Sequence, residues 1–199
     1  MAAWLVVGLG NPGPAYANNR HNIGAMVVHD LARRGTATWK SRRMLRAETA
    51  EIRVGSAGIG MPSPDASRVV LATTRTYMNE SGIPVRNLLG DVKVRPGTLI
   101  VVHDELDISL GQIRVKFGGG DNGHNGLKSI RGIVGTGEFY RVRVGIGRPT
   151  GRQEVTDWVL QNFPSSLKST LTEMVTLAGD AVESLILAGL ETTQSRYNS

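Results

Sequence analysis

Short apolar runs alternate with amphipathic stretches along the chain. Buried strands are predicted where aliphatic and β-branched residues cluster, at 4–7, 68–73 and 98–102. Helices are predicted where apolar residues recur every three or four positions, at 23–34, 83–89, 127–134, 155–162 and 165–190. Because strands and helices alternate, the pattern predicts an α/β fold with helices on both faces of one sheet.

Four further segments alternate well enough to be strands, at 36–40, 45–54, 112–117 and 139–146. The first two are expected to pair, the third to be antiparallel, and the fourth to carry Arg141 and Arg143 on one face. The Gly/Pro/Ser segment 55–66 and the glycine-rich segment 118–126 are expected to be loops. No repeat or linker divides the chain, so residues 1–199 are expected to form a single domain.

Polar side chains follow the predicted central strands. Asn11 and His21 follow the first, Tyr77 and Asn79 the second, and His103 and Asp104 the third, while His124 and Asn125 lie in the glycine-rich loop. Ligands of open α/β sheets bind beyond the carboxyl ends of parallel strands. These residues are therefore expected to gather at one edge of the sheet.

The turn after the first strand, GLGNPG at 8–13, formally matches a dinucleotide-binding fingerprint. Pro12 removes a backbone N–H from that turn, and a polar stretch follows Gly13 where the motif needs a helix. The nearest downstream carboxylate, Asp30, falls inside the first predicted helix. A tight turn is favoured, and a nucleotide-cofactor enzyme remains the alternative that titration with NAD(P) would test.

His21 is the strongest candidate for catalysis. An imidazole with a pKa of about 6.5 suits general-base work at neutral pH, and an aspartate on its other nitrogen would fix its tautomer. Asp104, at the end of the most hydrophobic strand, is the candidate partner, although spacing alone does not bring the two together. A metal site is not favoured, because neighbouring residues of the segment 103–107 would point to opposite faces of a strand.

Composition narrows the classes of protein. The chain has 40% hydrophobic and 20% charged residues, no apolar run long enough to cross a bilayer, no signal peptide and no cysteine. Its net charge of +6 comes from 18 arginines and 5 lysines against 17 acidic residues. This charge is equally compatible with a nucleic-acid partner and with ordinary surface charge, so a non-catalytic RNA-binding module is a second alternative.

Six motifs together resemble the bacterial-type peptidyl-tRNA hydrolases. They are VGLGNPG (7–13, followed by Tyr16), RHNIG (20–24), YMNESG (77–82), HDELD (103–107), GGGDNGHNGLK (118–128) and RVGIGRP (143–149). They span almost the whole chain in the family's order. The resemblance implies a monomeric, single-domain, three-layer α/β/α fold with a mixed, twisted central sheet.

The resemblance also implies a function and a set of roles. The substrate would be peptidyl-tRNA, hydrolysed in the cytoplasm at the ester to the 3′ ribose, without a cofactor, metal, membrane or obligate protein partner. His21 would be the base, Asp104 would orient it, and Asn11 would complete the catalytic set. Residues implied to bind peptide, 3′ end or tRNA phosphate are Tyr16, Tyr77, Asn79, Asn125, Lys116 and Arg143. His124 is expected to belong to a binding loop because glycines and asparagines surround it. The segment 55–66 has no assigned role.

Overall fold

An eight-stranded mixed sheet forms the middle of the molecule. The computed structural model describes residues 3–199. The strand order is β2-β3-β5-β1-β6-β8-β7, with β4 paired to β3. The strands are β1 (Ala3–Gly8), β2 (Lys40–Arg42), β3 (Ala47–Gly55), β4 (Gly58–Ile59), β5 (Ser67–Thr74), β6 (Leu99–Glu105), β7 (Ile113–Phe117) and β8 (Tyr140–Gly145). The central strands β5, β1, β6 and β8 are parallel, whereas β3 and β7 run antiparallel to their central neighbours.

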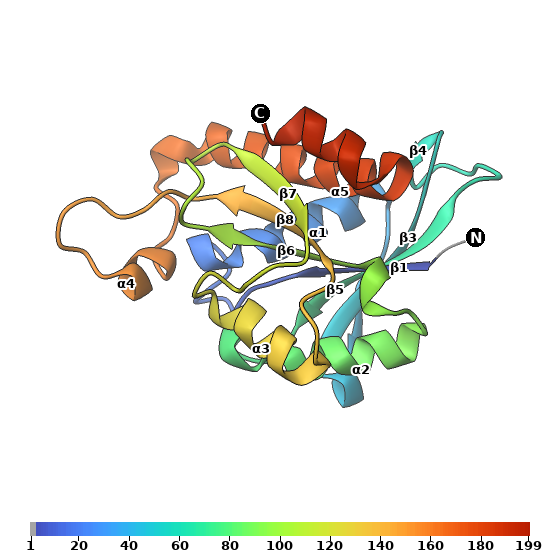
Figure 1. Cartoon of the computed structure of the whole chain (residues 1–199), viewed down its shortest axis with the longest axis horizontal. Helices are drawn as coiled ribbons and strands as arrows, with labels where there is room; N and C mark the ends of the chain where they lie inside the picture. Colours follow the sequence, from blue (N-terminus) through green and yellow to red (C-terminus); the bar gives the residue numbers. More distant parts are fainter. Residues whose placement is uncertain (1–2) are drawn as a thin grey trace.

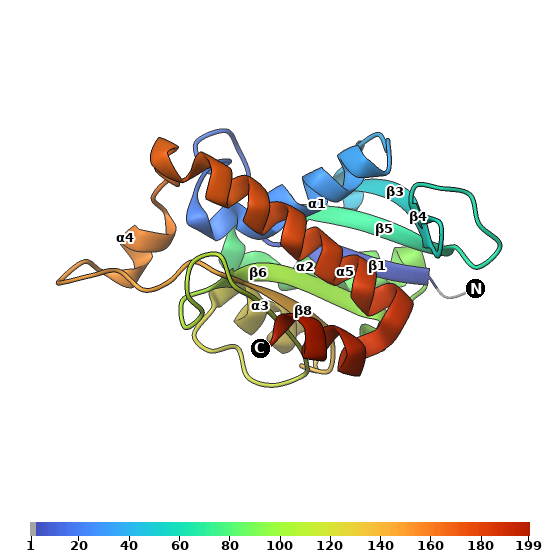
Figure 2. The same ribbon diagram turned by 90° about the horizontal axis from the view of Figure 1, so that it is seen from above.

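Helices cover both faces of this sheet. The helices α1 (Ile23–Arg34) and α5 (Lys168–Tyr197) pack on one face, and α2 (Gly82–Val92) and α3 (Asn125–Val134) on the other (Figure 1). The short α4 (Val155–Val159) lies beyond one end of the sheet (Figures 1 and 2). The three-layer fold with a mixed sheet is thus confirmed. Within the described residues, no helix has the length and apolar character needed to cross a membrane.

The central strands are apolar throughout because both of their faces are covered. Val6 and Ile100 point into the core beneath α1 and α5, while Leu5 and Val101 point into the core beneath α2 and α3. All four are fully buried. Sequence patterning finds such strands as continuous hydrophobic runs, which is the signature of a buried parallel sheet.

Several element boundaries differ from those expected. The strand β6 continues through Glu105, because residues 103–105 still pair with β8. The helix expected at 155–162 ends at Val159, and the last helix runs from Lys168 to Tyr197 with a break at Gly189, where φ is 77°. The segment 55–66 contains the short strand β4 as well as turns. The expected antiparallel pairing of the third alternating segment is confirmed in β7.

Close packing of α1 on the sheet depends on two glycines. A Cβ atom on Gly8 would overlap the backbone of Gly24, and one on Gly24 would overlap the carbonyl oxygen of Val102. The start of α1 therefore contacts β1 and β6 directly, and the backbone N–H of Leu9 donates to Val102 O at 3.0 Å. This contact brings the residues just before α1 against the carboxyl end of β6.

Candidate active site

A cavity of about 400 Å³ opens at the carboxyl ends of the central strands. Six segments supply its walls: the turn after β1, the short helix before α1, the helical turn after β5, the end of β6, the glycine-rich loop, and α4. The lining residues include Asn11, His21, Tyr77, Met78, Asn79, Asp104, Glu105, Asn122, His124, Asn125, Val155, Val159 and Leu160. The prediction that the polar strand ends gather at one edge is confirmed.

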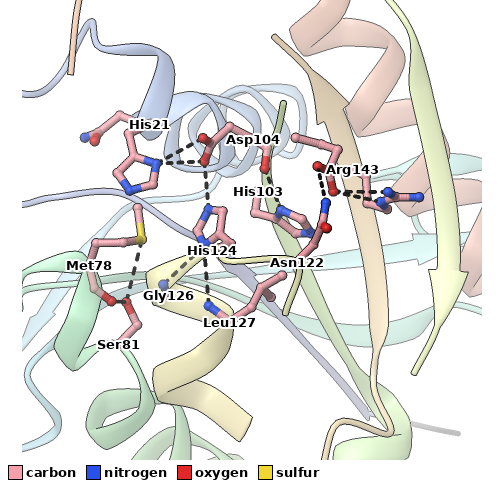
Figure 3. Close-up of polar contacts among 12 residues, drawn as sticks. His21, Met78, Ser81, His103, Asp104, Asn122, His124, Gly126, Leu127 and Arg143 are labelled. Carbon is pink, nitrogen blue, oxygen red and sulfur yellow. Dashed lines mark hydrogen bonds and ion pairs between the residues drawn. The ribbon is translucent and has the colours of Figure 1, made fainter. Parts of the chain in front are cut away.

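His21 and Asp104 meet inside this cavity. His21 lies on the 3-10 turn Arg20–Asn22, and Asp104 lies within β6, 83 residues further along the chain. The Nδ1 atom of His21 is 3.0 Å from both carboxylate oxygens of Asp104 (Figure 3). Because Asp104 can only accept when ionised, Nδ1 carries the proton and Nε2 keeps its lone pair. The pair therefore has the tautomer that a general base requires.

The charge state of this pair follows from burial and from neighbouring charges. Burial lowers the pKa of His21, but the charge of Asp104 and the hydrogen bond to it outweigh burial, so that the pKa of His21 is raised above 6.5. Burial favours the neutral form of Asp104, yet the two histidines beside it hold its pKa well below the usual range. Asp104 is thus an ionised carboxylate whose side chain is only 2% exposed.

His124 holds the same carboxylate from the opposite side. Its Nε2 donates to Asp104 Oδ1 at 2.8 Å. Its Nδ1 accepts the backbone N–H groups of Gly126 at 3.1 Å and Leu127 at 3.4 Å, which caps the first turn of α3 (Figure 3). His124 is therefore neutral with its proton on Nε2, and it links the N-terminus of α3 to Asp104.

Within residues 3–199, His21, Asp104 and His124 are grouped closely enough to bind a metal, with candidate ligand atoms within 4.8 Å of one another. The hydrogen bonds of His124 do not fit that role. To bind a metal through Nε2, the ring would have to carry its proton on Nδ1, which would then face two backbone N–H donors. The donor set fits a hydrogen-bonded carboxylate better than a metal centre.

The side chain of His103 contacts the backbone of Asp104 and not its carboxylate. Its Nδ1 lies 2.7 Å from the carbonyl oxygen of Asp104, and the side chain is fully buried. Burial holds the pKa of His103 well below 6.5, so the ring is neutral. It supports the backbone at Asp104.

Asn11 is held in one orientation by its neighbours. Its backbone N–H donates to Asn22 Oδ1 and its carbonyl accepts from Asn22 Nδ2, both at 2.9 Å. Its side-chain oxygen accepts the Met78 N–H at 2.8 Å. The Asn11 amide nitrogen has no partner within residues 3–199, so it is a free donor at the cavity wall. Asn22 belongs to the polar cluster visible in the sequence, but its clamp on the backbone of Asn11 follows only from the fold.

Three of the predicted peptide-binding residues line the cavity and a fourth does not. Tyr77, Asn79 and Asn125 line the cavity, and the amide side chains of Asn79 and Asn125 have no partner within residues 3–199. Tyr16 stands outside the cavity wall and packs edge-to-face on Tyr77, with ring centroids 6.3 Å apart. Tyr16 can therefore affect the cavity through the orientation of Tyr77.

Lys116 on β7 and Arg143 on β8 are not among the residues that line the cavity. The guanidinium of Arg143 donates to Glu105 Oε2 at 3.1 and 3.2 Å, and Glu105 lines the cavity. Burial, together with the charges of Arg141 and Arg143, lowers the pKa of Lys116. The three cations therefore lie near one another, with Glu105 as a carboxylate among them.

Two arginines of structural importance could not be assigned from the sequence. Arg141 is fully buried and donates to the carbonyl oxygens of Gly119, at 2.7 Å, and Gly120, which fixes the glycine-rich loop. Arg20 stacks on the Trp158 ring at 3.7 Å and donates to the carbonyl of Gln161. Arg20 directly precedes His21, so these contacts hold α4 and its apolar wall residues close to His21. The only signal for Arg141 was its position in a predicted strand, where it shares a face with Arg143.

Comparison with known proteins places this site in a family. The family model described as "Peptidyl-tRNA hydrolase" matches residues 5–199. The chain belongs to the peptidyl-tRNA hydrolase family. A peptidyl-tRNA hydrolase of Cutibacterium acnes is 52% identical over 197 residues, covering 99% of this chain and 98% of the relative. One of Streptomyces coelicolor is 51% identical over 198 residues, covering 100% and 96%.

A crystal structure of the peptidyl-tRNA hydrolase of Acinetobacter baumannii has the same fold. It superposes with a TM-score of 0.85 at 34% identity, covering 99% of this chain and 95% of that one. Membership of the peptidyl-tRNA hydrolase family confirms the resemblance drawn from the six motifs. In this fold the glycines at 8–13 serve a turn: residues 12–18 form turns instead of the helix that a dinucleotide site requires.

Proposed function

We propose that this chain hydrolyses the ester between the C-terminus of a peptide and the 3′ ribose of tRNA, with His21 as general base. The observation that carries the proposal is the buried pair of His21 and Asp104, which leaves His21 Nε2 unprotonated at the wall of a cavity. Free tRNA and free peptide are the products.

The reaction needs one water molecule and one base. His21 Nε2 takes a proton from water as the water oxygen attacks the ester carbonyl carbon, and Asp104 stabilises the imidazolium that forms. The free amide N–H of Asn11 is a donor for the carbonyl oxygen as it becomes negative. On collapse of the intermediate, the imidazolium returns the proton to the 3′ oxygen of the ribose, which leaves. General-base catalysis typically contributes roughly 10²–10⁴-fold.

Substrate binding is divided between amides and cations. Asn79 and Asn125 can bind the peptide backbone and the 3′ end, which allows any side-chain sequence to be processed. Tyr77, oriented by Tyr16, offers an aromatic face beside them. Lys116 and Arg143 are proposed to bind tRNA phosphate, which gives affinity without reading the base sequence.

The need for a cofactor, the oligomeric state and the cellular location are part of the same proposal. Ester hydrolysis by water, a base and amide donors needs no cofactor or metal. The cavity contains the proposed base, its carboxylate partner and the amide donors. A monomer with no obligate protein partner belongs to the same proposal. The cytoplasm, where translation leaves peptidyl-tRNA, is the proposed location.

The decisive experiment compares two histidine variants. His21→Ala should abolish deacylation of N-acetyl-aminoacyl-tRNA while tRNA binding largely survives. His29→Ala, which removes an exposed histidine of α1 outside the cavity, is the matched control and should keep normal turnover. Free aminoacyl-tRNA, assayed in parallel, should be a poorer substrate. Full turnover by a folded His21→Ala protein would exclude His21 as the base.

A further inference from the structure

A second cavity, of about 540 Å³, adjoins the active site on the side of β3 and β5. Its lining residues are Pro12, Arg43, Arg46, Arg75, Thr76, Tyr77 and Glu80. Tyr77 lines both cavities, and Pro12 directly follows Asn11 of the active site. We call this space the arginine cavity. A bound peptide that leaves the active site past Asn11 and Tyr77 would enter the arginine cavity.

Positive charge in the arginine cavity is not neutralised by ion pairs. Within residues 3–199, Arg43, Arg46 and Arg75 pair with no carboxylate, whereas the neighbouring Arg42 pairs with Asp91 at 2.8 Å. Arg75 is held in place by a bond from Nη1 to Ser41 Oγ at 2.7 Å and by its backbone N–H on Arg46 O at 2.8 Å. Glu80 is the one carboxylate among the lining residues. Three cations against one anion favour a negatively charged ligand.

A buried hydroxyl group also lacks a partner in this cavity. Thr76 is 7% exposed, and its Oγ1 is buried without a hydrogen bond. Because this oxygen is buried, it lies beneath the cavity surface, and it is the charge of the three arginines that favours an anion.

The sheet order determines which part of the substrate reaches the arginine cavity. The active site lies at β1 and β6, with β8 and β7 on one side and β5, β3 and β2 on the other. Figure 2 shows β8 and β5 on these opposite sides. Lys116 and Arg143, the proposed tRNA-binding cations, are on the first side, whereas Arg43, Arg46 and Arg75 are on the second. If tRNA leaves the ester toward β7, the peptide leaves it toward β3.

We propose that the arginine cavity binds acidic side chains of the peptide, in the residues that precede the ester-linked one. The inference rests on the proposed function, because the direction of the peptide follows from the placement of tRNA at Lys116 and Arg143. The arginine cavity would add a preference for acidic side chains to an enzyme whose proposed amide contacts are made with the peptide backbone and do not depend on the side chains. Peptidyl-tRNAs with aspartate or glutamate before the last residue are thus the preferred substrates.

The test compares matched substrates on one tRNA. N-acetyl-Glu-Glu-Phe-tRNA, N-acetyl-Gln-Gln-Phe-tRNA and N-acetyl-Lys-Lys-Phe-tRNA differ in the two residues that precede the ester-linked Phe. Glu and Gln have the same shape and differ in charge, and Lys reverses the charge. The ratio of kcat/KM for the Glu over the Gln substrate should be about threefold to tenfold at low salt, mainly through KM, and should shrink at high salt. Arg43→Gln/Arg46→Gln should bring the ratio to about one, and Arg43→Glu/Arg46→Glu should favour the Lys substrate.

A control variant separates this role from general damage. Arg95→Gln removes an exposed arginine near the opposite end of β6 and should keep the wild-type ratio. Because the readout is a ratio between substrates, a variant of lower overall activity remains informative.

Three results of this test would overturn different parts of the reasoning. Equal kcat/KM for the Glu and Gln substrates in the wild-type enzyme overturns the acidic-peptide site while leaving the esterase intact. Failure of the wild-type enzyme to hydrolyse any of the three substrates overturns the proposed function itself. Weakened binding of deacylated tRNA by Arg43→Gln/Arg46→Gln, with an unchanged ratio, assigns the cavity to RNA phosphate and refutes the peptide.

Discussion

Replacement of Asp104 by asparagine tests the proposed mechanism most directly. Asp104 Oδ1 accepts from His124 Nε2 at 2.8 Å, and both of its carboxylate oxygens lie 3.0 Å from His21 Nδ1. An asparagine oxygen facing His124 puts the amide NH2 group against His21 Nδ1. Two donors cannot share that contact, so His21 moves its proton to Nε2 and Nδ1 becomes the acceptor. Nε2, the nitrogen that must receive the proton of water, is then already protonated.

The size of the effect has two parts. A hydrogen bond to a charged group is worth roughly 1.5–3 kcal/mol, so loss of the charge that stabilises the imidazolium lowers kcat by roughly 10- to 100-fold. The wrong tautomer adds a further penalty, and an Asp→Asn change in a serine-protease triad costs about 10⁴-fold in total. For Asp104→Asn we expect kcat to fall by roughly 10³–10⁴-fold, with a small change in KM because the carboxylate is nearly inaccessible.

The pH profile gives a second readout of the same change. Activity requires neutral His21, so in the wild-type enzyme it rises with pH through the His21 pKa, which Asp104 raises above 6.5. In Asp104→Asn the carboxylate is gone while burial still lowers the pKa. The acid limb of the residual activity should therefore move to lower pH.

The assay is turnover of N-acetyl-aminoacyl-tRNA across the acid and neutral range, with Tm as a check on folding. Asp107→Asn is the matched control, since Asp107 pairs with Arg148 outside the cavity and should leave kcat and the acid limb unchanged. A folded Asp104→Asn enzyme with kcat within a few-fold of wild type, or with an acid limb moved to higher pH, would refute the proposed role of Asp104.

Three further predictions concern binding and packing. Arg20→Met keeps the apolar stem but loses the stacking and the hydrogen bonds to α4, and should lower the free energy of unfolding by roughly 1–3 kcal/mol in urea titrations. Gly24→Ala should destabilise by roughly 1–3 kcal/mol because its methyl group meets a carbonyl of β6, whereas Gly90→Ala, with open space around it, should be neutral or stabilising in the same Tm assay. Lys116→Ala and Arg143→Ala should each weaken tRNA binding and reduce the slope of log K against log salt by about one; an unchanged slope would exclude phosphate contact.

Much of the fold could be predicted because its determinants are local. The helix over 23–34 was located to the residue, since its apolar period and the glycine after it are both visible in the sequence. The central strands were found because both of their faces are buried, which makes them uniformly apolar. Boundaries were less accurate where tertiary pairing extends an element. Residues 103–105 are polar or charged and belong to β6 only because β8 pairs with them.

The candidate site divides in the same way. The sequence by itself determined which residue types are available at each strand end, and its motifs identified His21, Asp104 and Asn11 as candidates. Only the tertiary structure decided their geometry. The contact of His21 with Asp104 depends on strand order, register and the glycine contacts of α1 with the sheet, none of which is encoded by spacing along the chain.

Long-range contacts also decided what could not be predicted at all. The sequence placed His124 in a flexible-looking glycine loop, but its two nitrogens join the N-terminus of α3 to Asp104. The sequence does not predict burial for Arg141 or Arg20. Both are buried because backbone carbonyls from distant segments accept their hydrogen bonds. A charged side chain is buried only where the whole fold supplies partners for it, and those partners are known only once the chain has folded.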